Sequence, residues 1–363
     1  MQRRAFVSLA SSLLVASAAV RAAHADTDVP QADGGLDEAL QQFLALPGTK
    51  SYLLHVGPGG SGGQVAEQPD LFLFTASAYK TFVLAQYLRE TEAGRLSEDE
   101  QVPIDDSVRM FSSPVFFNLA GATTARSVLE AMIAHSDNAA TNAATGRAGV
   151  GRVRALIAQA GLSSIRIPDS ARIFASYLLG APPGVDLGWP GVLQAAQNPP
   201  GPLRPPLNDV ITLAGSARDF VSWYEQALAG AFFARPETLT EFKRIQAMSE
   251  QIARAVPADT VAYAKGGEVV SLNGFNAKSL AGQMVAGGDR PTPVTFCFVV
   301  NWDGPAEAFA GVEAAFFAAT KDVLGAVRRA LWASASERHC HLDGRTSCLT
   351  RFSVEPPRWS ARV

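Results

Sequence analysis

A serine and a lysine stand three residues apart in the string Ser77-Ala78-Tyr79-Lys80. On a helix this spacing places both side chains on one face, one turn apart. A serine hydroxyl becomes a good nucleophile only when a neighbouring base takes its proton. A lysine can be that base if burial or a nearby second cation lowers its pKa. Lys80 is also the only one of the six lysines with a serine at this spacing, so we predict an acyl-transfer site with Ser77 as nucleophile rather than a chance pairing on a helix surface.

Two further polar strings follow along the chain. Ser136-Asp137-Asn138 brings a second hydroxyl and an amide, and it lies between helical segments, where such residues also favour helix N-caps. Lys265-Gly266-Gly267 follows the apolar strand pattern of residues 261–264. Lys265 supplies positive charge, and the missing side chains of the two glycines allow another backbone to approach closely. A surface lysine before a glycine hairpin is the alternative interpretation of this third string.

In this order the three strings resemble the Ser-x-x-Lys, Ser-Asp-Asn and Lys-Thr-Gly signature of class A β-lactamases and penicillin-binding proteins. The resemblance covers roughly residues 37–334. It implies that Ser136 passes a proton to the leaving nitrogen and that Asn138 hydrogen-bonds the amide side chain of the substrate. It also implies that Lys265 supports the substrate carboxylate and the proton relay.

The resemblance further implies an oxyanion hole built from the backbone N–H groups of Ser77 and Glu268, with Gly266 and Gly267 leaving room for the substrate. Gly266 replaces the threonine of the family string. This replacement removes one hydroxyl donor to a substrate carboxylate, and Lys278 and Arg290 are the candidates to compensate for it.

Class A enzymes carry a loop glutamate that activates the water which releases the acyl group. Residues 138–223 contain no glutamate, and Asp169 lies nearest to where that acid would fall. Residues 182–206 are rich in proline and predict a long loop rather than a helix. We therefore expect a β-lactamase-like serine hydrolase that deacylates through Asp169 or another route. The alternatives are a D-alanyl-D-alanine peptidase or esterase on the same scaffold, or a protein that traps a β-lactam without turnover.

The order of elements predicts one α/β (α+β) domain. Helical periodicity at 36–46 is followed by strand patterns at 51–56 and 71–74, a helical block, strand patterns at 261–264, 275–285 and 295–302, and a helix over 305–332. This pattern indicates an antiparallel five-stranded sheet flanked by N- and C-terminal helices and interrupted by an inserted all-helical lobe. We expect a sheet lobe over 37–76 and 256–334 and a helical lobe over 77–255.

The composition excludes several classes of partner. A net charge of −3, with 18% charged and 47% hydrophobic residues, fits a well-packed core and gives no reason to expect nucleic acid. No apolar stretch after residue 25 approaches the ~20 residues that span a bilayer. We expect a monomer that acts on a small-molecule substrate, with no cofactor and no metal.

The N-terminus has the pattern of an export signal. Arg3 and Arg4 precede an apolar run, and Ala23-His24-Ala25 is a small-x-small cleavage site, so residues 1–25 are predicted to be removed. The paired arginines favour the twin-arginine route over the ordinary secretory one, and the mature protein is expected in the periplasm or outside the cell. Residues 26–36 are predicted to be a flexible leader.

The three cysteines fit an oxidising compartment. Cys297 lies in an apolar strand pattern and is predicted to be an inert core thiol. In the predicted tail over 335–363, Cys340 and Cys348 could form a disulfide. A metal site from His339, Cys340 and His341 is the alternative for that cluster.

Overall fold

The computed structural model describes residues 35–287 and 291–342, with side chains as far as residue 332. The predicted signal peptide, nearly all of the leader, Arg290 and Cys348 lie outside the described residues, as do the side chains of the His339–His341 cluster. The predictions made for them remain predictions.

The centre of the fold is the predicted five-stranded antiparallel sheet, with the strand order β2-β1-β9-β8-β7. Its strands are β1 Thr49–Val56, β2 Gln64–Glu67, β7 Val261–Leu272, β8 Phe275–Ala286 and β9 Thr292–Asp303. The prediction of the sheet is confirmed, but one strand differs. The segment predicted at 71–74 forms the short strand β3 Leu73–Phe74, which pairs with β6 Ala214–Gly215 outside this sheet.

The physical reason for this difference is the lack of an apolar face on β2. All four of its residues are exposed or half-buried, and only the hydrogen-bonded ladder with β1 defines it as an edge strand. Strand β3 is fully buried, and its partner is about 140 residues away in the sequence. An apolar run indicates burial but does not identify the strand that it pairs with.

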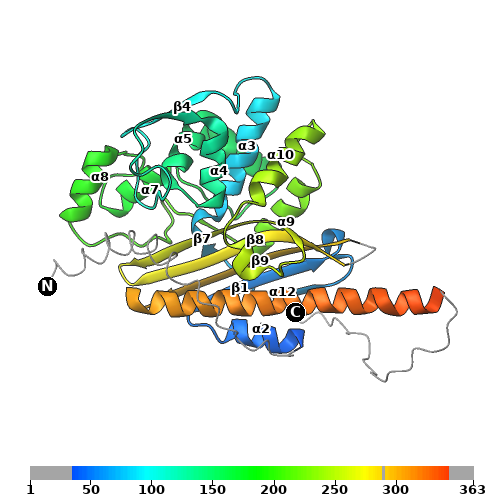
Figure 1. Ribbon diagram of the computed structural model, residues 1–363. Coiled ribbons are helices and arrows are strands. Elements are labelled where there is room, and N and C mark those ends of the chain that lie inside the picture. The colour runs from blue at the N-terminus through cyan, green and yellow to red at the C-terminus, as the bar shows by residue number, and fades with distance from the viewer. Residues whose placement is uncertain (1–34, 288–290, 343–363) are drawn as a thin grey trace.

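Both faces of the sheet are covered. Phe296, Phe298 and Val300 of β9 pack toward α2 Leu36–Leu44 and α12 Ala306–Leu342, whereas Cys297 and Val299 face the helical lobe. Figure 1 shows the two terminal helices on one side of the sheet and the lobe on the other. Burial on both sides explains the unbroken apolar run of β9. Burial also raises the pKa of the Cys297 thiol, as expected for an inert core residue.

The helical lobe is inserted between β3 and β7 (Figure 1). Its helices are η2 Ala76–Tyr79, α3 Lys80–Glu92, α4 Ala125–Ala134, α5 Asn138–Ala148, α6 Val150–Gln159, α7 Ala171–Leu178, α8 Gly188–Gln197, α9 Ala217–Leu228, α10 Pro236–Gln246 and α11 Ile252–Ala255. A small hairpin pairs β4 Gln101–Ile104 with β5 Gly121–Thr124, and the turn η1 Pro58–Gly60 joins β1 to β2.

Two predicted elements differ from the structure. Helix α8 lies inside the proline-rich stretch that was expected to be a loop, because Pro190 falls in its first turn, where no intrahelical N–H bond is lost. Helix α12 runs on to Leu342, past the predicted end of this helix at residue 332.

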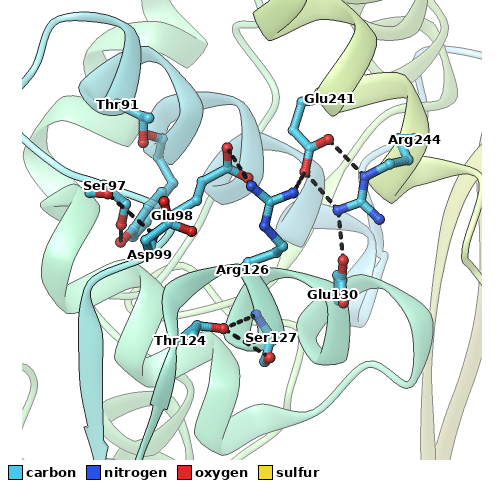
Figure 2. A network of polar contacts seen from close by, with 11 residues as sticks. Thr91, Ser97, Glu98, Asp99, Thr124, Arg126, Ser127, Glu130, Glu241 and Arg244 are labelled. Carbon is cyan, nitrogen blue, oxygen red and sulfur yellow. Dashed lines mark hydrogen bonds and ion pairs between the residues drawn. The ribbon is translucent and has the colours of Figure 1, made fainter.

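A charged network joins α4 to α10 at the outer side of the lobe (Figure 2). Arg244 pairs with Glu130 and Glu241 at 2.6 Å each, and Arg126 lies between Glu98 and Glu241. Burial and the neighbouring Glu241 raise the pKa of Glu98 to about 7. The network fixes α4, whose C-terminus leads directly to Ser136.

Within the part of the chain that the structure describes, no helix is long and apolar enough to cross a membrane.

Candidate active site

Ser77 lies in the short 3-10 turn η2, and α3 begins only at Lys80. The predicted helix therefore starts with a tighter turn than an α-helix has. Ala76, directly before the serine, has φ +48°, a left-handed conformation that costs an alanine on the order of 1 kcal/mol. Ser77 itself is half-buried, whereas its neighbours on both sides are buried. The turn thus presents the serine hydroxyl from a strained and otherwise buried backbone.

Side chains of the sheet hold this turn in place. Asn301 of β9 accepts a hydrogen bond from the Phe74 N–H and donates one to the Phe74 carbonyl, both at 2.9 Å. Ser279 of β8 donates to the Thr75 carbonyl at 2.7 Å. The nucleophile turn is therefore fixed to strands that lie more than 200 residues later in the sequence.

Helix α3 is anchored from its other side by the buried hydroxyl of Thr81. This oxygen accepts hydrogen bonds from Trp223 Nε1 at 2.9 Å and from Gln246 Nε2 at 2.8 Å. Phe82 packs edge-on against Trp223, with ring centroids 4.7 Å apart. These contacts to α9 and α10 set the position from which Lys80 extends.

The two predicted lysines meet at Ser136. Lys80 Nζ lies 3.2 Å from Ser136 Oγ, and Lys265 Nζ lies 3.0 Å from the same oxygen. Lys80 also donates to the Ser136 carbonyl at 2.5 Å and to Asn138 Oδ1 at 2.8 Å. The structure thus brings together the first, second and third strings, and it places the hydroxyl of Ser136 between two amines. No hydrogen bond of Ser77 Oγ is present among the described residues.

Asp137 fixes the backbone of this junction. Its buried carboxylate accepts from the N–H groups of Val115 and Phe116 at 3.0 and 2.9 Å, and from Ala140 N–H at 2.8 Å. The last bond is a helix N-cap for α5, so the capping interpretation of the string and the functional one hold together. Ser136, between α4 and α5, adopts φ +56°, a left-handed conformation that is uncommon for a serine.

Burial makes both lysines weak bases. Lys80 is fully buried, and desolvation together with the positive charge of Lys265 holds its pKa well below the ordinary value, against an opposing effect of Asp137. Desolvation lowers the pKa of Lys265 to about 7. A buried lysine whose pKa is lowered in this way is a candidate general base, as the chemistry of Ser77 requires.

The backbone of β7 lies directly against the nucleophile turn. A Cβ atom built on Gly267 would lie 2.4 Å from Ser77 N and 2.4 Å from the Thr75 carbonyl oxygen. Since β7 is the edge strand of the sheet, part of its backbone N–H row is free of ladder bonds. This close approach fits the oxyanion hole that the resemblance implies, with the N–H of Glu268 one residue further along β7.

Gly266 has a different neighbour. A Cβ atom there would lie 1.8 Å from Gln251 Oε1 and 2.4 Å from the Ser279 carbonyl oxygen. Gln251 is 7% exposed, and its Oε1 has no hydrogen-bond partner within the part of the chain that the structure describes. The sequence alone gave no signal for Gln251, Asn301 or Ser279, because each acts through a contact with a distant segment.

Asp169 is not brought to this cluster. It forms an ion pair with Arg154 at 2.7 Å, it is 45% exposed, and no hydrogen bond joins it to Ser77, Lys80 or Ser136 among the described residues. It lines a separate cavity of about 720 Å³ beside α7, together with Arg166 and Asn208. The described residues contain no group of three or more His, Cys, Asp or Glu side chains that could hold a metal ion.

Comparisons with solved structures show where this fold occurs. A β-lactamase from Xanthomonas campestris is 17% identical, with a TM-score of 0.60 over 81% of this chain and 97% of that chain. A β-lactamase from Chitinophaga pinensis is 15% identical, with a TM-score of 0.61 over 80% and 98%. PBP-A is 16% identical, with a TM-score of 0.58 over 81% and 96%, and a mutant of it was solved as an acyl-enzyme complex with penicillin G.

A search of curated protein sequences found no significant match. The sequence model of the beta-lactamase enzyme family, however, matches residues 36–274. This match spans well over half of the chain and agrees with the resemblance seen in the three strings. The chain therefore belongs to the beta-lactamase enzyme family, whose members are serine hydrolases of this fold.

Proposed function

We propose that the protein opens β-lactam amides through a covalent acyl-enzyme on Ser77. The observation that supports this most directly is the position of Ser136 Oγ, within hydrogen-bond distance of both Lys80 Nζ and Lys265 Nζ. A hydroxyl between two weakly basic amines can relay a proton from one side of a reacting bond to the other.

Acylation then proceeds in two proton transfers. Neutral Lys80 takes the proton of Ser77 Oγ while that oxygen attacks the lactam carbonyl carbon. The N–H groups of Ser77 and Glu268 receive the developing oxyanion. As the C–N bond breaks, Ser136 donates its proton to the leaving nitrogen and recovers one from Lys80, which becomes neutral again. Lys265 stabilises the negative charge that builds on Ser136 during this relay.

Hydrolysis of the acyl-enzyme requires a base for water. Asp169 faces Arg154 rather than the cluster, so we assign this role to Lys80, which acylation leaves in its neutral form. A long-lived acyl-enzyme would make the protein a β-lactam trap, and turnover of simple esters without penicillin labelling would identify an esterase.

Intact-mass spectrometry of the folded protein tests the proposal. Mixed with penicillins and with a simple ester, the wild type should gain the mass of the opened ring on Ser77 and then lose it. Ser77→Ala should fold normally and form no adduct. If Ser77→Ala still forms the adduct, or still turns over either compound, the assignment of Ser77 as the nucleophile is refuted.

Export to the periplasm or the medium remains part of this proposal. It depends on the N-terminal 25 residues and would be checked by N-terminal sequencing of the mature protein.

A further inference from the structure

One cation expected to serve the substrate is already paired within the protein. Lys278 of β8 is 1% exposed, and its ammonium group contacts the carboxylate of Glu268 and, at 2.7 Å, that of Glu313 on α12. It also lies 4.7 Å from the ring centre of Phe317. Glu268 is the cross-strand partner of Lys278 in the β7–β8 register. A substrate carboxylate would therefore have to displace a carboxylate of the chain itself.

A threonine in place of Gly266, as in the family string, would have no room for its side chain. An ideal Cβ on Gly266 would lie 1.8 Å from the Gln251 carboxamide oxygen and 2.4 Å from the Ser279 carbonyl oxygen. The second of these neighbours is backbone, so a longer side chain would force the two strands apart. Gln251 directs Oε1 toward Gly266, and among the described residues this oxygen has no hydrogen-bond partner. An oxygen acceptor repels rather than binds an anion.

The remaining charges at this edge are unfavourable for an anion. All three N–H groups of protonated Lys80 donate to acceptors of the protein. Lys265 donates two of its three to Ser136 Oγ and the Gly266 carbonyl. The carboxylates of Glu250 and Glu268, 48% and 36% exposed, both act on Lys265. A second anion brought to this strand would meet two negative charges that are open to solvent.

We infer that the site selects acyl compounds that carry no free carboxylate beside the scissile bond, such as esterified or otherwise uncharged β-lactams and neutral esters. The inference rests on the proposed acyl transfer at Ser77 and narrows its substrate class. The positions where a substrate carboxylate would be recognised are occupied by side chains of the protein. Glu268 forms an ion pair with Lys278, and the Gln251 carboxamide packs against Gly266. Peptides that end in a carboxylate are disfavoured by the same contacts.

A matched pair of compounds tests this selectivity. Benzylpenicillin and its methyl ester share the ring and differ by one negative charge, and the rate of adduct formation on Ser77 is followed by mass spectrometry for each. The wild type should react at least tenfold faster with the methyl ester. Glu268→Gln removes the carboxylate that holds Lys278 at the strand edge. It should raise the rate with the free acid about tenfold relative to the rate with the ester.

Glu313→Gln is a second variant at the same lysine. It removes the α12 acid that also pairs with Lys278, and it should raise the rate with the acid relative to the ester in the same direction as Glu268→Gln. Thermal melts confirm that both variants are folded. Gln251→Ala gives an independent measurement, since removal of the unpaired oxygen should also raise the relative rate with the acid.

Three results would overturn the inference. The first is a wild type that reacts as fast with the acid as with the ester. The second is a ratio of ester to acid acylation rates that neither Glu268→Gln nor Gln251→Ala changes. The third is an Arg290→Ala variant that loses its reaction with benzylpenicillin but keeps that with the methyl ester. In each of these the proposed function still stands, because Ser77 is acylated. If neither compound forms an adduct on Ser77, both the proposed function and the inference fail.

Discussion

The close approach of β7 to the nucleophile turn can be broken by a single methyl group. In Gly267→Ala the new Cβ would lie 2.4 Å from Ser77 N and from the Thr75 carbonyl oxygen, whereas ordinary contact begins at 3.4 Å. Both neighbours are backbone atoms, so strand and turn must separate by about 1 Å. The Thr75 carbonyl is also held by Ser279 at 2.7 Å, which opposes this movement.

The expected loss follows from the geometry of the oxyanion hole. A displacement of 1 Å at a reacting centre costs roughly 100-fold in rate. The loss of one aligned oxyanion donor costs roughly 100- to 1000-fold, or about 3–4 kcal/mol. Acylation of Ser77 in Gly267→Ala should therefore fall by at least 100-fold. The proton relay through Ser136 should be intact, because Lys80 and Lys265 meet there without help from Gly267.

Stopped-flow acylation with a reporter penicillin ester, with mass spectrometry of the adduct, gives the rate. Gly151→Ala is the matched control, since a Cβ at this position in α6 meets nothing within 4 Å. It should acylate at the wild-type rate and be slightly more stable, because alanine favours a helix over glycine by up to ~1 kcal/mol. Acylation of Gly267→Ala within threefold of the wild-type rate would show that β7 does not form the oxyanion hole.

Four further outcomes are expected. The acylation rate should rise with pH as Lys80 loses its proton, well below the pH at which an ordinary lysine does so, and fall above pH about 7 as Lys265 loses its own. Lys265→Arg should move the descending limb to higher pH. Asp137→Ala leaves three backbone N–H groups unpaired and should lower the free energy of unfolding by about 3 kcal/mol, measured in urea. Asp169→Asn should leave the deacylation rate within twofold, and a large loss there would make Asp169 the base. Because the pKa of Glu98 is raised to about 7 in the folded protein, the free energy of unfolding should fall as pH rises from about 4.5 to 7. In Glu98→Gln this pH-dependent decrease should be smaller by on the order of 1 kcal/mol.

The parts of the site that a sequence can predict are those carried by short strings. The spacing of Ser77 and Lys80 within one helical turn is local, and so is the capping role of Asp137. The family order of the strings then places Ser136 and Lys265, and the structure brings their side chains to within 3.0 Å of each other. For the same reason the strand patterns of β1, β7, β8 and β9 were enough to predict four of the five strands of the sheet.

The parts that escaped prediction depend on contacts between distant segments. Asn301 holds the backbone of Phe74 across 227 residues, yet an asparagine in an apolar strand carries no sign of its partner. Lys278 was a candidate for binding the substrate, but the β7–β8 register pairs it with Glu268. A register is set by the whole hairpin, and no single residue of it reveals which charges will neutralise each other.

The two halves of the proposed reaction have unequal support in the structure. Acylation needs a base, a relay and an oxyanion hole, and the residues for each lie on elements fixed by buried contacts: η2 by Asn301 and Ser279, and α3 by Thr81. Deacylation needs a carboxylate or amine that faces the acyl carbon from the water side. Asp169, which lies nearest to the expected position in the sequence, is paired with Arg154 at 2.7 Å. The positions of these charged groups therefore support the first step of the proposed reaction better than the second. The balance between hydrolysis and trapping depends on whether Lys80, after returning its proton to Ser136, can reach a water molecule.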